Sequence, residues 1–232
     1  MLYLKLIALS FIFLATPFGV GFSSNSLDEI DQFMFKRNLK RDSYQCEISQ
    51  RIHKFDDKKI IKGHINYMDT FKGKYHYTAR WDNDFLVLST NIFLRNVSKS
   101  SIKHTPSQYQ EMKSLIKQAQ DYWNQQVRSY YPIKFEFNLV EDKAQAFFRP
   151  ALINRASRGP YYAGWSTFWN MEVVAHEIAH MFGLDDEYEN AAFGSDTSQC
   201  NQGSLMCTHT ANTKLYQYHF HLISRRVFCN EE

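Results

Sequence analysis

Residues 176–186 bring together side chains that can hold a metal ion, in the order His-Glu-Ile-Ala-His-Met-Phe-Gly-Leu-Asp-Asp. His176 and His180 are four residues apart, so on a helix their imidazoles lie one turn apart on the same face. Two imidazole nitrogens held in this way can bind one zinc ion. Glu177 is next to the first ligand, where it can take a proton from a zinc-bound water and pass it to a leaving amine. The segment therefore predicts a zinc site with an adjacent general base.

The third ligand is expected from the residues that follow the second histidine. Gly183 falls three residues after His180, where a residue in the left-handed conformation would end the helix and turn the chain back. That turn can bring Asp186 to the metal and leave a fourth position for water. Asp185 and Glu187 are alternatives, and only spacing favours Asp186. An aspartate adds a negative charge, so this zinc would be a weaker Lewis acid than one held by three histidines.

The strands that must position this segment are predicted from the alternation of apolar and polar side chains. They cover residues 74–81, 85–94 and 133–139, with two short strands near residues 146–148 and 161–165.

The helices have clear start signals. Thr105 and Gln108 can form a capping box, with proline at the first helical position between them, and the helix of about six turns ends before Pro132. Asn170 is expected to cap the helix that carries the histidines, and residues 215–227 form a final helix. The order of elements predicts an α+β domain with one mixed sheet, a long helix, an active-site helix and a mostly irregular and helical carboxyl-terminal subdomain.

The pattern H-E-x-x-H-x-x-G-x-x-D resembles the zinc motif of the metzincin metalloproteases, in a form with aspartate as third ligand. Ser204-Leu205-Met206 resembles the Met-turn of that group, in which a methionine packs beneath the metal site. The order of strand, long helix, strands and motif helix is also similar. The resemblance covers about residues 85–232, and only residues 176–206 carry specific motifs. It implies a zincin-like fold with a cleft whose edge strand binds extended peptides, and hydrolysis of peptide bonds.

The chain departs from that group at two positions. Asp186 replaces the usual third histidine, and Thr208 stands two residues past the methionine, where some members carry a tyrosine that assists the oxyanion. His219 and His221 are expected to pack or to lie at the surface rather than bind metal. The remaining candidates for the oxyanion role are Tyr188, His209, Tyr216 and Tyr218.

The amino terminus has the pattern of a targeting segment. Lys5 precedes an apolar run that ends at Phe22, and small residues follow, so residues 1–22 are predicted to be a signal peptide. An uncleaved membrane anchor is the alternative, although a proline and two glycines interrupt the run. We therefore expect a secreted or periplasmic protein without stable membrane association after cleavage. Residues 23–72 would be an extension or pro-segment, and residues 73–232 the catalytic domain.

Charge and cysteine content narrow the class of protein. A formal net charge of +3 is too small to indicate nucleic acid or an anionic membrane as partner. Cys46, Cys200, Cys207 and Cys229 form an even set, which in an exported protein predicts two disulfides with three ways of pairing. One way closes a loop between Cys200 and Cys207 and leaves Cys46 with Cys229. A free Cys46 that caps the metal in a latent precursor is the alternative.

Together these features predict an exported zinc metalloendopeptidase that acts on peptides or proteins, with zinc on His176, His180 and Asp186 and with Glu177 as general base. One alternative is a zinc amidase that acts on cell-wall peptides. Another is an inactive protease-like module that keeps zinc for structure. The intact Glu177 favours an active enzyme, since a structural site needs no base beside its ligand.

Overall fold

The structure is a computed structural model, and it describes residues 55–56, 58–63, 75–96, 104–154, 156, 163–188, 200–208 and 210–229. The predicted signal peptide at residues 1–22, Cys46, and most of the predicted extension at residues 23–72 lie outside these residues. Among the described helices, none is both long and apolar enough to cross a membrane.

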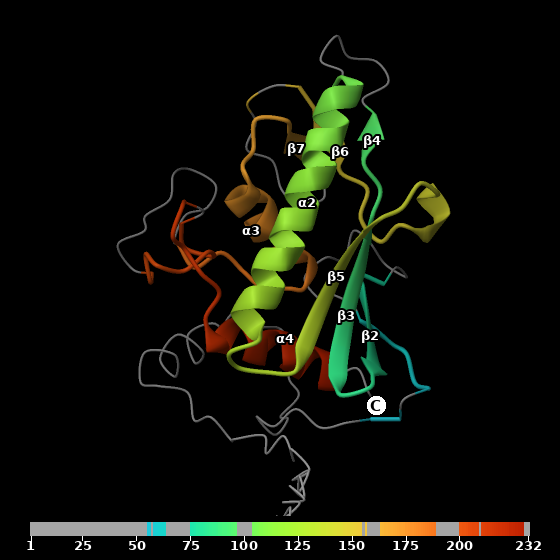
Figure 1. Cartoon of the computed structure of the whole chain (residues 1–232), viewed down its shortest axis with the longest axis vertical. Helices are drawn as coiled ribbons and strands as arrows, with labels where there is room; N and C mark the ends of the chain where they lie inside the picture. Colours follow the sequence, from blue (N-terminus) through green and yellow to red (C-terminus); the bar gives the residue numbers. More distant parts are fainter. Residues whose placement is uncertain are drawn as a thin grey trace, which may run out of the picture.

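A four-stranded mixed sheet occupies the lower part of the molecule in Figure 1. Its strand order is β1-β2-β3-β5, in which β1, β2 and β3 are antiparallel neighbours and β5 runs parallel to β3. The predicted strands at residues 74–81, 85–94 and 133–139 are confirmed to within a few residues. The bounds are β1 Ile61–Gly63, β2 Tyr77–Asp82, β3 Phe85–Ile92 and β5 Ile133–Leu139.

Strand β1 comes from the segment that the sequence analysis assigns to an extension or pro-segment, and it pairs with β2 over three residues. Phe55, in the same segment, contacts the rings of Trp81 and Phe228.

A second, three-stranded parallel sheet continues the first at its upper end, so the described strands form two sheets and the prediction of one mixed sheet is wrong. Strand β3 leads into β4 (Arg95–Asn96), which pairs with β6 (Ala151–Ile153), and β6 pairs with β7 (Gly164–Ser166). The strand expected near residues 146–148 was placed too early, because Asp142 caps a short 3₁₀ helix, η2 (Lys143–Gln145), that turns the chain first. Phe148 makes only an isolated bridge to Ile92, and regular pairing begins after the proline at position 150.

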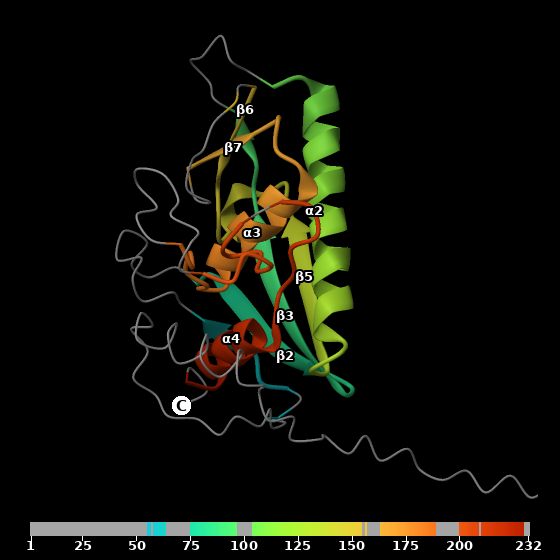
Figure 2. The same cartoon turned by 90° about the vertical axis from the view of Figure 1, so that its left-hand side faces the viewer.

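Three helices complete the described fold: α2 (Pro106–Val127), α3 (Met171–Met181) and α4 (Gln217–Cys229). The capping box is confirmed, since Gln108 N donates to Thr105 Oγ1 at 3.2 Å and Thr105 N donates to Gln108 Oε1 at 2.9 Å. Asn170 caps α3 by accepting from Val173 N at 3.0 Å. Helix α4 begins two residues later than predicted. Figures 1 and 2 show α2 along the height of the molecule, α3 beside it and α4 at the lower end.

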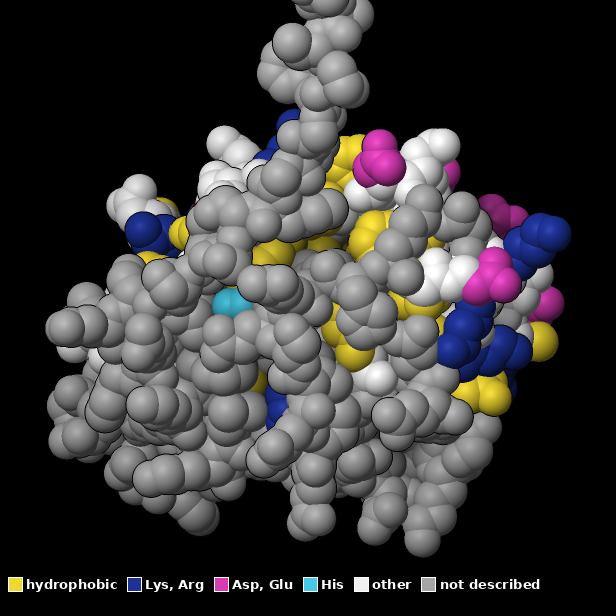
Figure 3. All heavy atoms as spheres, turned by 90° about the horizontal axis from the view of Figure 1, so that it is seen from below, with side chains coloured by type: hydrophobic (Ala, Val, Ile, Leu, Met, Phe, Trp, Pro, Cys, Tyr) yellow, Lys and Arg dark blue, Asp and Glu magenta, His cyan; other side chains and the backbone are white. Residues whose placement is uncertain are grey.

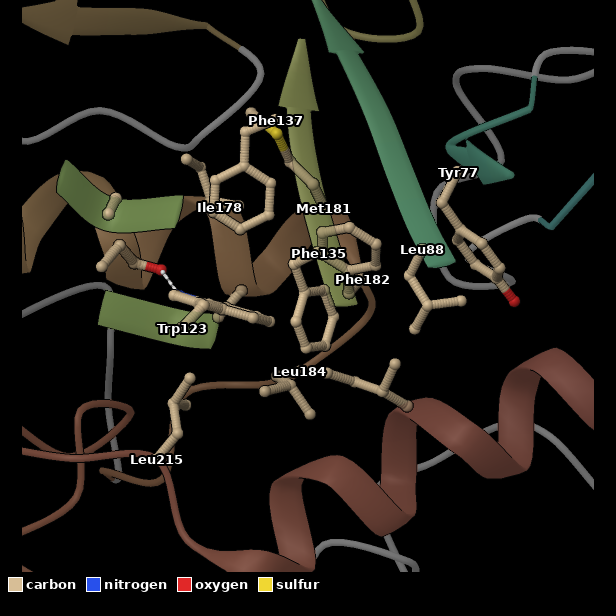
Figure 4. Packing of buried hydrophobic residues seen from close by; sticks show 14 of the residues in the cluster. Tyr77, Leu88, Trp123, Phe135, Phe137, Ile178, Met181, Phe182, Leu184 and Leu215 are labelled. Atoms are coloured by element: carbon tan, nitrogen blue, oxygen red, sulfur yellow. Dashed lines mark hydrogen bonds between the residues drawn. The ribbon is translucent and has the colours of Figure 1, made fainter. Parts of the chain in front are cut away.

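Aromatic rings join the sheet to the two helices that cover it. The buried Trp123 of α2 packs edge-on against Phe135 and Phe137 of β5 and also contacts Phe182, next to the end of α3. Its indole nitrogen donates to the carbonyl of Ala175 at 3.3 Å, as Figure 4 shows. Close packing of this kind leaves little freedom for the helix it holds. The core therefore fixes the position of α3, which carries both histidines.

The described part of the lower face carries charges of both signs. In Figure 3, basic and acidic side chains lie among one another there, with apolar side chains between them.

Candidate metal centre

Helix α3 places the two histidines against each other, as their spacing predicts. The rings of His176 and His180 meet edge to face with their centroids 4.8 Å apart, and their Nε2 atoms are 3.2 Å apart. His176 is buried, and the His180 side chain is 12% exposed. The Asp186 side chain is 23% exposed, so the group is largely enclosed, with its most exposed side chain at Asp186.

The chain leaves α3 through a turn, residues 182–186, which we call the metal turn. Gly183 has a φ of +83° and donates its N–H to the carbonyl of His180 at 3.0 Å, so the predicted left-handed glycine is confirmed. A Cβ at this position would lie 2.6 Å from Nε of Arg226, so an added side chain would also require the buried Arg226 to shift. The turn brings Asp186 Oδ1 to 3.1 Å from His176 Nε2 and 3.4 Å from His180 Nε2.

Backbone carbonyls fix the tautomer of both imidazoles. His176 Nδ1 is 2.9 Å from the carbonyl oxygen of Leu205, and His180 Nδ1 is 2.6 Å from that of Leu184. A carbonyl can only accept, so each Nδ1 carries a proton that it donates. In the neutral ring the lone pair is then on Nε2, the atom that faces Asp186. This is the arrangement that metal-binding histidines adopt.

His176, His180 and Asp186 therefore form a group that can hold a metal ion, with one ligand atom from each and all of these atoms within 4.8 Å of one another. Two imidazoles and one carboxylate are a donor set used by catalytic zinc sites, which keep a fourth position open. Of the three acidic residues weighed as third ligand, Asp186 belongs to this group, whereas Asp185 and Glu187 do not.

Protons and metal ions compete for the same atoms in this group. Burial acts to raise the pKa of Asp186, but the adjacent imidazoles of His176 and His180 outweigh it and lower that pKa. Burial acts to lower the pKa of His180, but the hydrogen bond and charge of Asp186 outweigh it and raise that pKa. A proton on Nε2 lies where a metal would bind. Metal binding should therefore release protons and weaken in acid.

Glu177 follows the first histidine on α3 and is partly buried. Ala175, the residue before His176, is fully buried, and its carbonyl accepts the hydrogen bond from Trp123. The side chain of Glu177 is therefore less enclosed than the core residues of α3.

Residues 204–207, which we call the Met206 turn, contact α3 and the residue that follows the metal turn. The Leu205 carbonyl accepts from His176, and the Met206 carbonyl accepts from Glu187 N at 2.9 Å. Met206 itself is fully buried. A disulfide joins Cys200 to Cys207, which confirms that pairing and is typical of proteins that fold in an oxidising compartment. Cys46 and the side chain of Cys229 lie outside the described residues.

The oxyanion candidates separate by burial. Tyr218 is fully buried and donates its hydroxyl to Glu187, so it cannot reach a substrate. Tyr188 and Tyr216 are partly buried and remain candidates, and His209 lies outside the described residues. His219 and His221 are both buried, and each forms a hydrogen bond to another side chain. This confirms that they pack in the interior.

Four polar residues that no sequence pattern groups together form a buried cluster, which we call the Glu187 cluster: Glu187, Ser204, Tyr218 and His219. Burial acts to raise the pKa of Glu187, but hydrogen bonds from His219, Tyr218 and Ser204 outweigh it and lower that pKa. The sequence signal for this cluster is an acidic residue directly after Asp186, and by spacing alone that residue is an alternative third ligand.

Comparison with known proteins gives no further identification. No protein-family model matches the chain, and neither a curated protein nor a solved structure matches it.

Proposed function

We propose that this chain is a zinc metallopeptidase that hydrolyses peptide bonds at the His176-His180-Asp186 centre. The observation that carries the proposal is the fixed tautomer of both histidines, whose Nε2 atoms face the same carboxylate oxygen. Hydrogen bonding of the other ring nitrogen is the usual second-shell feature of metal-binding histidines. A pair of histidines that served packing alone would have no need to converge in this way.

The nature of the donors supports zinc and a catalytic role. Structural zinc sites are closed by four protein ligands, often cysteines, whereas catalytic sites use three and leave one position open. Both cysteines with described side chains are in a disulfide, so neither can serve as a thiolate ligand. With zinc bound, the site would supply a Lewis acid that polarises the substrate carbonyl and lowers the pKa of a water to about 7.

Residues of the chain would bind the metal and transfer the proton. His176, His180 and Asp186 hold the metal, and Glu177 takes the proton from the attacking water. The water oxygen adds to the carbonyl carbon, and the bond from that carbon to the peptide nitrogen then breaks. Glu177 returns the proton to the leaving nitrogen, so that an amine and a carboxylate are released. The arrangement of strand, long helix, strands and motif helix, with a buried methionine in the Met206 turn, supports the resemblance to metzincins.

The experiment that tests this proposal measures zinc per chain after reconstitution and dialysis, together with turnover of a broad peptide library. We expect about one zinc per chain, cleavage of peptides, and loss of both in His180→Ala prepared in the same way. A parent protein without zinc would contradict the proposal. Zinc without cleavage of any peptide would favour a metal-binding module, and cleavage of cell-wall peptides alone would favour an amidase.

A further inference from the structure

We propose that Glu187 is a positioning residue, whose buried carboxylate holds the neighbouring ligand Asp186 in place for the metal. The inference rests on the metal centre of the proposed function and extends it to a residue that does not touch the metal.

The carboxylate of Glu187 is held from helix α4. It is 1% exposed, and its Oε1 accepts from His219 Nε2 at 3.0 Å and from the hydroxyl of Tyr218. The Nδ1 atom of His219 accepts from the N–H of Tyr216 at 2.9 Å, so the ring carries its proton on Nε2 and can donate it. Both donors therefore point at one oxygen of the carboxylate, and neither can rotate away without losing a bond.

The backbone of Glu187 is held from the Met206 turn. Its N–H donates to the carbonyl of Met206 at 2.9 Å, and Met206 N donates to Ser204 Oγ at 3.2 Å. Ser204 Oγ also lies 3.3 Å from His219 Nε2 and 3.4 Å from the Tyr218 hydroxyl. The peptide between Asp186 and Glu187 is thus fixed by contacts on both the backbone and the side chain of Glu187.

The same contacts reach the first histidine. Leu205 lies between Ser204 and Met206, and its carbonyl accepts from His176 Nδ1 at 2.9 Å. One cluster therefore sets the position of the carboxylate ligand and of the carbonyl that orients an imidazole ligand. Asp186 lies at the end of an irregular turn, with no helix or strand to hold it, so its position depends on such contacts.

Burial of a carboxylate is unfavourable unless hydrogen bonds compensate for the lost solvation. A cluster that only attached α4 to the domain could do so with apolar side chains, as Phe220 and Ile223 of the same helix do. A carboxylate next to a metal ligand, with its donors on a different element, instead fits the outer-shell role in which hydrogen bonds orient the ligands.

The test compares the zinc affinity of the parent with that of Glu187→Gln and Tyr218→Phe, measured by competition with a chromophoric chelator. The visible absorption spectrum of the Co²⁺-substituted proteins reports the ligand geometry. We expect 10- to 100-fold weaker zinc binding in both variants, about the loss found when outer-shell partners are removed, together with a changed Co²⁺ spectrum.

Tyr131→Phe is the matched control. It also removes a phenol hydroxyl that bonds a buried histidine of α4, but that histidine is His221, which has no described contact with either turn. We expect its zinc affinity to stay within about twofold of the parent, with an unchanged Co²⁺ spectrum.

The possible results are distinct. Folded Glu187→Gln and Tyr218→Phe proteins with the parent's zinc affinity and Co²⁺ spectrum would overturn the inference. If Glu187→Gln does not fold, Tyr218→Phe decides, since it loses a single oxygen atom. Zinc binding without peptide cleavage in the parent would refute the proposed function while leaving the affinity comparison valid. A parent that binds no metal would refute both.

Discussion

The hydrogen-bond partners of the two imidazoles affect the Lewis acidity that a bound metal would have. Both partners are backbone carbonyls, those of Leu205 and Leu184. A carboxylate in the same place would raise the basicity of the ligand more than a carbonyl does. The weaker donation from two carbonyl-bonded imidazoles offsets part of the negative charge that Asp186 brings. A metal bound there would therefore keep more Lewis acidity than an aspartate ligand alone suggests.

Glu177→Gln separates metal binding from chemistry. Because Glu177 is no ligand, we expect the variant to keep its zinc and to lose peptide cleavage by a factor of about 10²–10⁴, the usual contribution of a general base. Zinc content and initial rates measure the two effects. Glu172→Gln, in the first turn of the same helix, is the control and should keep both. Cleavage by Glu177→Gln at the parent's rate would rule out its role as base.

Gly183→Ala should disrupt the metal turn. The residue has a φ of +83°, and an added Cβ would lie 2.6 Å from Nε of Arg226. Strain and this contact together should lower the free energy of unfolding by about 1–3 kcal/mol and should reduce zinc content. Gly164→Ala is the control, because its Cβ would meet nothing closer than 3.5 Å. Urea unfolding of the two variants checks the difference, and equal stability would contradict the role of Gly183.

Because His221 is buried, we expect the free energy of unfolding to fall in mild acid. Burial lowers its pKa from the ordinary 6.5 to about 4. Between these values the unfolded chain binds a proton at this histidine and the folded protein does not, so stability falls as the pH falls. From pH 7 to pH 5 this one group should contribute a loss of up to about 2 kcal/mol.

Urea unfolding of the parent and of His221→Gln at both pH values isolates this effect, because the other titrating groups are common to the two proteins. The variant should lose less stability than the parent over the same range. An equal loss in both would show that His221 is accessible to protons in the folded state.

At the scale of whole elements, the start of α2 depends on a reciprocal pair of hydrogen bonds. Thr105→Ala removes the side-chain acceptor for Gln108 N and should lower the free energy of unfolding by about 1 kcal/mol. Ser107→Ala changes an exposed residue at the same helix start and should have little effect. Thermal or urea unfolding of the two variants measures the difference, and equal stability would mean that the cap does not limit the helix.

Elements with strong local signals could be predicted from the sequence. The capping box, the helical period of α2 and the alternation in β2 and β5 each reflect a side-chain pattern several residues long. Strands β4 and β6 have two and three residues, too short for any period to appear. Their positions follow from pairing with a distant segment, so the strand predicted near residues 146–148 was misplaced.

In the candidate site, too, only the part whose residues are close in sequence could be predicted. Its three possible ligands lie within eleven consecutive residues, so their spacing on a helix and a turn predicted that they would converge. The Glu187 cluster draws on residues about thirty positions apart, and nothing in their spacing links them. From the sequence alone Tyr218 is therefore a candidate for the oxyanion role, although in the structure its buried hydroxyl donates a hydrogen bond to Glu187.

For the whole molecule, metal binding should contribute directly to stability. The ligands join α3 to the metal turn, and a ligand that binds only the folded state stabilises it by mass action. We expect a free-energy gain of about 4 kcal/mol at a zinc concentration a thousand times the dissociation constant, seen as a higher melting temperature. A chelator should reverse the shift, and His180→Ala should show none. If zinc does not change the melting temperature of the parent protein, the prediction is wrong.

The hydrogen bond between His176 and Leu205 spans 29 residues, and that between Glu187 and His219 spans 32. Residues 176–186 are therefore synthesised before Leu205 and before His219. A chain made only as far as residue 200 has both histidines but lacks the carbonyl that fixes the first and the helix that holds the neighbour of Asp186. The arrangement of His176, His180 and Asp186 with all of these supporting contacts can form only after α4 has been made, so the candidate metal centre is completed late in the synthesis of the chain.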